Sequence, residues 1–173
     1  MHSPEWIWLA GLLDGEGCIH INRQRVGRRA DLLTDNFRLY VQITMGHRGT
    51  LDRCAAITGR GTVQHHTVSN KKANPAFCWM TSAGDAEAVL RGLEGHLFTK
   101  AAEAELALRF CNIAPWHGGR FRGRKPQELV DAAARCYWQM RMLKPRWRFY
   151  VKKLSRDDRA EIKRLGLSPA AAA

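Results

Sequence analysis

A helix that runs into closely spaced glycines and then directly into a strand constrains this chain more than any other sequence feature. Pro4 is typical of a first helical turn, and an apolar run follows it. We predict a helix over residues 4–14, ended by Gly15 or Gly17, because glycine readily closes a helix. Cys18–Gln24 then alternates apolar and polar side chains, which is the pattern of a half-buried strand.

The rest of the chain continues in a regular order. Further strands are predicted over residues 37–45, 62–69 and 76–81, and helices over residues 50–58, 84–97, 100–113, 126–143 and from Ser155 onward. Long polar loops are predicted over residues 25–35, 117–125 and 144–153. This order predicts a single α+β domain over residues 1–173. Its core, at about residues 4–113, is an αββαββα unit with a four-stranded antiparallel sheet, and C-terminal helices follow at about residues 125–166.

The predicted sheet has one apolar and one polar face. Phe37, Leu39, Val41 and Ile43 share one face, whereas the other carries hydrogen-bonding side chains with few acids. A solvated surface is the ordinary alternative, but the flanking loops are basic and the strands are long enough to follow a major groove about 12 Å wide. The residues predicted to contact DNA from the strands are His20, Asn22, Gln24, Arg38, Tyr40, Gln42, Thr44, Gln64 and His66. Those predicted to do so from the loops are Arg25, Arg28, Arg29, Lys71 and Lys72, while Arg120, Arg122, Arg124, Lys125, Arg146 and Arg148 are expected to hold phosphates.

The charge of the chain also favours a polyanionic partner. Lys and Arg number 28 against 16 Asp and Glu, a net charge of +12, so nucleic acid is the first candidate and an anionic membrane surface the second. No stretch approaches the roughly 20 apolar residues that span a bilayer, and no secretory signal is visible. The 5 cysteines contain no Cys-x-x-Cys pair, which argues against a structural zinc site. We therefore expect an intracellular protein with reduced thiols, bound to nucleic acid rather than to a membrane or a small-molecule substrate.

Residues 9–17 read LAGLLDGEG and resemble the nine-residue signature of the LAGLIDADG homing endonucleases, although most members have Asp where this chain has Glu16. The resemblance implies a saddle-shaped sheet over double-stranded DNA. It also implies intron-homing nuclease activity: a Mg²⁺-dependent, staggered double-strand cut in a long pseudo-palindromic site. The motif occurs once, so the second copy would come from a second chain, which predicts a homodimer.

The motif helix is predicted to pack one face against its own core and to present another face to a partner chain. Leu9, Leu12 and Leu13 would anchor it to its own core. The face predicted to meet the partner carries Ile7, Ala10, Gly11 and Asp14. Small residues there would let a second helix approach closely, and tight packing within the monomer is the alternative.

The predicted cleavage site follows from the helix end. Two copies of Glu16 at a dimer axis would repel unless a cation lay between them, and oxygen ligands suit Mg²⁺. The resemblance implies that Glu16 and the carbonyl of Gly15 hold the metal, while Asp14 is structural. It also implies a catalytic Lys100 at the start of a long helix, where the helix dipole disfavours a cation. His47 and Arg48 are candidates for a further basic group, and Arg48 is the one we select.

Two other functions remain open on this sequence. A catalytically inactive DNA-binding regulator could share the fold, although an intact Glu16 and Lys100 argue against it. An RNA maturase that helps an intron to fold could share it as well. Cleavage of plasmid DNA with and without Mg²⁺ separates the first alternative from a nuclease, and a preference for intron RNA over duplex DNA separates the second.

Overall fold

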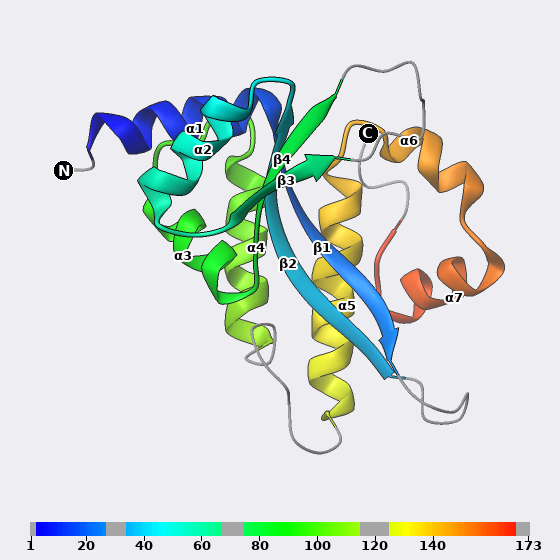
Figure 1. Ribbon diagram of the computed structural model, residues 1–173. Helices are drawn as coiled ribbons and strands as arrows, with labels where there is room; N and C mark the ends of the chain where they lie inside the picture. The colour runs from blue at the N-terminus through cyan, green and yellow to red at the C-terminus, as the bar shows by residue number, and fades with distance from the viewer. Residues whose placement is uncertain (1–2, 27–33, 67–74, 115–124, 169–173) are drawn as a thin grey trace.

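The computed structural model describes residues 3–26, 34–66, 75–114 and 125–168. A sheet of 4 antiparallel strands in the order β1-β2-β4-β3 is covered by helices on one face (Figure 1). The strands are β1 (Gly17–Val26), β2 (Thr34–Met45), β3 (Thr62–His66) and β4 (Ala76–Ser82). The helices are α1 (Pro4–Glu16), α2 (Arg48–Thr58), α3 (Gly84–Gly92), α4 (Ala101–Ile113), α5 (Gln127–Met142), α6 (Trp147–Tyr150) and α7 (Arg156–Arg164). The predicted α+β class and element order are confirmed.

The sheet has the two faces that the alternation predicted. Ile19 pairs with Val41 in register, and both side chains are fully buried against the helices together with Leu39 and Ile43. Trp79 of β4 is also fully buried, so it belongs to the core. The same buried cluster continues through α4 and α5 into α7, so the C-terminal helices share the core of the sheet.

Gly17, and not Gly15, ends the first helix. Helix α1 includes Gly15 and Glu16, and the backbone N–H of Gly17 still donates to the carbonyl of Leu13. A Cβ atom on Gly17 would lie 2.2 Å from Leu13 Cδ1 and 2.6 Å from its carbonyl oxygen. Only glycine lets the chain turn this closely past the last turn of α1, and β1 begins at the same residue.

Several predicted boundaries were wrong. Strands β1 and β2 reach Val26 and start at Thr34, so the ends of the expected turn at residues 25–35 are strand. Helix α3 ends at Gly92 instead of residue 97. The loop expected over residues 144–153 contains α6 and a 3-10 turn (Val151–Lys153). The last helix begins as predicted, with a reciprocal capping box between Ser155 and Asp158. None of the helices in the described ranges is both long and apolar enough to cross a membrane.

Candidate functional site

Asp14, near the end of α1, caps the start of α4. Its carboxylate accepts hydrogen bonds from the backbone N–H of Phe98 (2.7 Å) and of Lys100 (3.0 Å). Burial alone would raise the pKa of Asp14, but these backbone hydrogen bonds outweigh it and lower the pKa. The carboxylate is therefore occupied within its own chain, in the structural role that the resemblance implied, and the prediction that it also faces a partner rests on its position alone.

Lys100 lies against the end of the motif helix. Its Nζ atom donates to the carbonyl oxygen of Asp14 at 2.5 Å, and the Thr99 hydroxyl donates to the same oxygen at 3.1 Å. Although Lys100 is the N-cap residue of α4, its ammonium lies at the carboxyl end of α1, where the helix dipole favours a cation. This arrangement removes the conflict noted in the sequence and places the Lys100 ammonium at Asp14, in the same last turn of α1 as Glu16.

Glu16 is the last residue of α1, and its side chain is exposed, as is Gly15. Among the residues that the structure describes, no group of three or more His, Cys, Asp or Glu side chains could hold a metal ion. One chain thus offers an exposed carboxylate next to a helix-end carbonyl, a partial set of oxygen ligands for a hard cation.

The two candidates for a further basic group have different roles. His47 is the N-cap of α2, and its Nδ1 atom accepts from the backbone N–H of Thr50 at 3.2 Å. Arg48 is 59% exposed, forms an ion pair with Asp52 at 3.5 Å and lies 5.7 Å from the centre of the Phe77 ring. No contact within the described chain joins Arg48 to the end of α1. His47 is accounted for as a helix cap, and the catalytic role of Arg48 stays a prediction.

One stripe of α1 is open to solvent. Ile7 is 54% exposed, and Gly11 and Gly15 follow it at intervals of four residues. A Cβ atom on either glycine would meet no atom within 4 Å. Ala10 does not belong to this stripe: it is 1% exposed and packs in the core of its own chain, so its prediction as a contact residue was wrong. Phe98 is 89% exposed beside the end of the helix.

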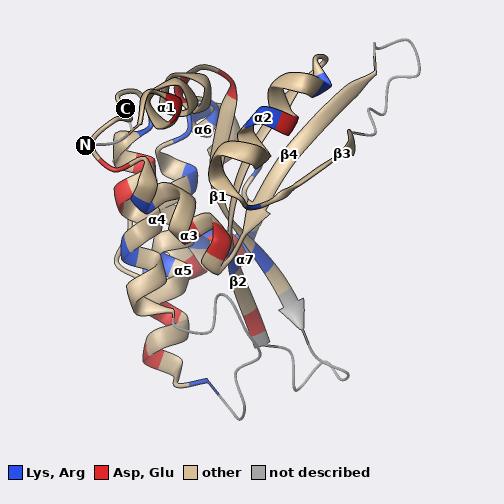
Figure 2. Ribbon diagram, turned by 60° about the vertical axis from the view of Figure 1, so that its left-hand side comes forward, with Lys and Arg blue, Asp and Glu red and all other residues tan. Residues whose placement is uncertain are grey.

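The open face of the sheet carries the predicted polar side chains. His20 stacks on Tyr40, with ring centres 5.3 Å apart and planes inclined by 10°. Burial, and then the charge of Lys144, lowers the pKa of His20 to about 4, so it is neutral near pH 7. Asp35 is the only acidic residue in the four strands as described (Figure 2). The strand pairing places the following candidates on this face: His20, Asn22, Gln24, Arg38, Tyr40, Gln42, Thr44, Gln64 and His66.

The remaining predicted DNA contacts cannot be placed in the same way. Arg25 lies in β1 rather than in a loop, and its side chain is outside the description. The other four predicted loop contacts lie outside the described residues, as do three of the expected phosphate contacts. The residues concerned are Arg28, Arg29, Lys71, Lys72, Arg120, Arg122 and Arg124.

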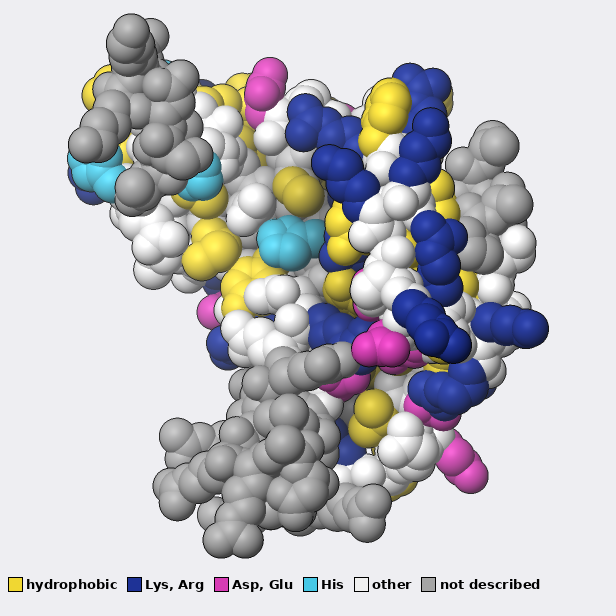
Figure 3. Space-filling model, turned by 90° about the vertical axis from the view of Figure 1, so that its right-hand side faces the viewer, with side chains coloured by type: hydrophobic (Ala, Val, Ile, Leu, Met, Phe, Trp, Pro, Cys, Tyr) yellow, Lys and Arg dark blue, Asp and Glu magenta, His cyan; other side chains and the backbone are white. Residues whose placement is uncertain are grey.

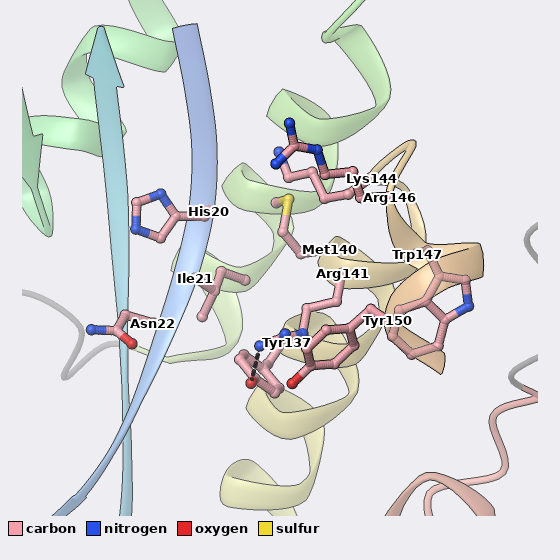
Figure 4. Close-up of a pocket in the computed structure, with 10 residues that line it drawn as sticks. All are labelled: His20, Ile21, Asn22, Tyr137, Met140, Arg141, Lys144, Arg146, Trp147 and Tyr150. Carbon is pink, nitrogen blue, oxygen red and sulfur yellow. Dashed lines mark hydrogen bonds between the residues drawn. The ribbon is translucent and has the colours of Figure 1, made fainter. Parts of the chain in front are cut away.

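A pocket at the free edge of β1, which the sequence did not predict, adjoins this face. Figure 4 shows aromatic and basic side chains from α5, α6 and the turn between them around it, opposite His20 and Asn22. Lys144 donates to the carbonyl of Ile19 (2.7 Å) and to Glu103 (2.6 Å), which fastens α5 to the strand edge. Figure 3 shows Lys and Arg side chains in a column along the C-terminal segment, beside the face that carries histidine. The exposed Lys and Arg residues of that segment include Arg146, Arg148, Lys152, Lys153, Arg156 and Arg159.

This combination of saddle, helix cover and terminal motif is the fold of the LAGLIDADG homing endonucleases. Among similar solved structures, the homing endonuclease I-CvuI in complex with its target has 22% identity and a TM-score of 0.65, with 95% of this chain and 96% of that chain covered. The archaeal intron-encoded I-Vdi141I complexed with DNA has 10% identity and a TM-score of 0.67, with 95% and 98% covered. I-TnaI has 15% identity and a TM-score of 0.60, with 95% and 97% covered. No protein-family model matches the sequence, and no curated protein sequence does.

Proposed function

We propose that this chain is a site-specific homing endonuclease. As a homodimer it would make a staggered, divalent-metal-dependent double-strand cut in a long pseudo-palindromic DNA site. The observation that carries the proposal is the end of α1, where the Lys100 ammonium is held at the carbonyl of Asp14, two residues before the exposed Glu16. A fixed cation near an exposed carboxylate and a helix-end carbonyl is a chemical set suited to phosphodiester hydrolysis. Acting on genomic DNA, the enzyme would work inside the cell.

DNA would lie across the open face of the sheet. That face combines donors and acceptors, and the single acid of the described strands, Asp35, points to the covered face instead, where it pairs with Arg23. The C-terminal basic column and the pocket at the β1 edge would hold phosphates on the flank of the groove, as predicted for Arg146 and Arg148. The solved structures of I-CvuI with its target and of I-Vdi141I with DNA support this placement for a chain of the same fold.

Two copies of the chain would supply a complete site. The chain covers 96% of I-CvuI but only 52% of I-SmaMI, which is thus about twice as long. We expect a second copy of this chain to occupy the place that the additional residues of I-SmaMI occupy in that protein. The exposed stripe of Ile7, Gly11 and Gly15 on α1 is the surface on which we place the contact, because glycine lets two helix backbones approach closely.

Each chain would contribute metal ligands and one basic group to the cleavage reaction. Glu16 and the carbonyl of Gly15 would bind the cation, and their oxygen-only character suits Mg²⁺, which would act as a Lewis acid on the phosphate and its attacking water. Structures of I-CvuI were solved in the presence of Ca and of Mg. Lys100 would stabilise negative charge that develops on the phosphate, since its ammonium is already oriented by Asp14.

The decisive experiment uses a randomised duplex library, incubated with the purified protein and with Mg²⁺ or EDTA. We expect Mg²⁺-dependent cleavage products that define one pseudo-palindromic site with staggered ends. Binding without cleavage would instead indicate an inactive regulator. If the protein neither binds nor cuts any duplex but retains intron RNA, the proposed function is wrong and the maturase alternative holds.

A further inference from the structure

Arg23 is a charged residue on the covered face of the sheet. It lies in β1 opposite Phe37 of β2, and its side chain is 15% exposed. The guanidinium carbon lies 6.0 Å from the ring centres of both Phe37 and Tyr137. Burial would lower the pKa of Arg23, but hydrogen bonds to Asp35 and Glu161 reverse that effect and raise it. An arginine in such a position needs carboxylate partners, and the chain provides two of them.

The two partners come from different parts of the fold. One nitrogen of Arg23 bonds to Asp35 of β2 at 2.5 Å, and the other bonds to Glu161 of α7 at 2.6 Å. Glu161 also accepts a hydrogen bond from Trp138 Nε1 of α5 at 3.1 Å. Helix α7, which lies beside β1 (Figure 1), is thereby joined through one guanidinium to the outer half of the β1–β2 ribbon. We use that term for the paired residues 22–26 and 34–38, which lie away from the end of α1.

We propose that Glu161 is a positioning residue for base recognition, which acts through Arg23 to hold the outer half of the β1–β2 ribbon in the shape that reads DNA. The neighbours of Arg23 in β1 are Asn22 and Gln24, which point to the opposite, open face. Asn22 pairs with Arg38 across the ribbon. A change in the twist at Arg23 therefore moves these side chains relative to the bases. The inference rests on the proposed function.

A second ion pair on α7 provides a matched control. Arg164 of α7 bonds to Asp131 of α5 at 2.7 Å, and neither residue lies on the sheet. Both pairs fasten α7, but only the Glu161 pair reaches a strand. Asp131→Asn should therefore loosen the helix without altering the ribbon, whereas Glu161→Gln should alter the ribbon as well. Gln at position 161 keeps an acceptor for Trp138, which limits the damage to the core.

The first measurement is hydrogen–deuterium exchange in the DNA-free protein. We expect Glu161→Gln to accelerate exchange about tenfold at the amides of residues 22–24 and 36–38, and Asp131→Asn to leave these amides unchanged. Arg23→Lys is a second test, because a single ammonium cannot span Asp35 and Glu161 as the forked guanidinium does. It should reproduce the effect of Glu161→Gln.

The second measurement is the cleavage of every single-base variant of the site that the wild-type protein selects. Glu161→Gln should reduce discrimination about fivefold or more at the bases read near Asn22 and Gln24, and leave discrimination near Gln42 and Thr44 unchanged. Equal profiles for Glu161→Gln and Asp131→Asn, in exchange and in base preference, would overturn the inference. If the wild-type protein cuts no DNA, the proposed function fails separately, and the exchange experiment still decides whether the ribbon depends on Glu161.

Discussion

Asp14 brings Lys100, from a distant part of the sequence, to the end of the motif helix that carries Glu16. The carboxylate of Asp14 fixes the start of α4, and its backbone carbonyl holds the Lys100 ammonium at the end of α1. The lysine is thus oriented before any substrate arrives, which lowers the reorganisation needed during reaction. Glu16, in contrast, is exposed and has no hydrogen-bond or ion-pair partner among the described residues, which leaves its carboxylate open to the cation that we propose it binds.

The first prediction at this scale concerns Glu16→Gln. Gln keeps the size of the side chain but removes the charge that would hold the cation, so we expect cleavage to fall about 10³-fold or more while DNA binding is retained. Cleavage of the selected site and a gel-shift assay without metal measure the two effects. Glu5→Gln, at the exposed start of α1, is the control and should behave like the wild type. Undiminished Mg²⁺-dependent cutting by the Glu16 variant would contradict the assigned site.

The second prediction concerns His20. Because its pKa is about 4 when folded and 6.5 in the unfolded chain, the unfolded state binds more protons between these values. Stability should therefore fall as the pH drops below 6.5, and the loss should be complete near pH 4. Between pH 7.5 and pH 5 we expect the wild type to lose on the order of 2 kcal/mol more than His20→Gln. Urea unfolding at both pH values measures this difference, and parallel losses would show that His20 ionises freely.

At the scale of elements, the strands were predictable because alternation reflects which side of a strand meets the core. Leu39, Val41 and Ile43 were assigned correctly for that reason. Nothing in the sequence indicated that Arg23 lies on the covered face, because a charge there needs carboxylate partners and one of them, Glu161, lies 138 residues later in the chain. Ala10 was misplaced for a similar reason: a small side chain suits a close contact with any neighbour, and only the folded chain shows that the neighbour is its own core.

The end of α1 gives a prediction about stability. Gly17→Ala would place a Cβ atom 2.6 Å from the carbonyl oxygen of Leu13, so the helix end must shift, and we expect a loss of about 1–3 kcal/mol. Gly84→Ala, at the first residue of α3, is the control, since its Cβ atom would meet nothing within 4 Å, and it should leave the stability within about 1 kcal/mol of the wild type. Thermal unfolding of both variants without DNA measures the difference. Equal effects would show that the turn adapts to a side chain.

At the scale of the whole molecule, the proposed endonuclease function requires two copies of the chain. A single subunit presents one saddle, one exposed Glu16 and one exposed stripe on α1, whereas a pseudo-palindromic site has two halves. Pairing through α1 would bring the carboxyl ends of two motif helices together, and both catalytic ends would then face the same stretch of DNA. The C-terminal helices remain on the outer flank of each ribbon, where Glu161 and Lys144 fasten them to β1.

Gly11→Leu tests this assembly directly. Because nothing lies within 4 Å of a Cβ atom at Gly11 in the monomer, the larger side chain should leave the fold intact. It should block the approach of a second α1, so sedimentation is expected to show monomers where the wild type forms dimers, and double-strand cleavage should be lost. Phe149→Leu, at an exposed position on α6, is the control and should stay dimeric. A Gly11→Leu dimer that still cuts both strands would place the subunit contact elsewhere on the molecule.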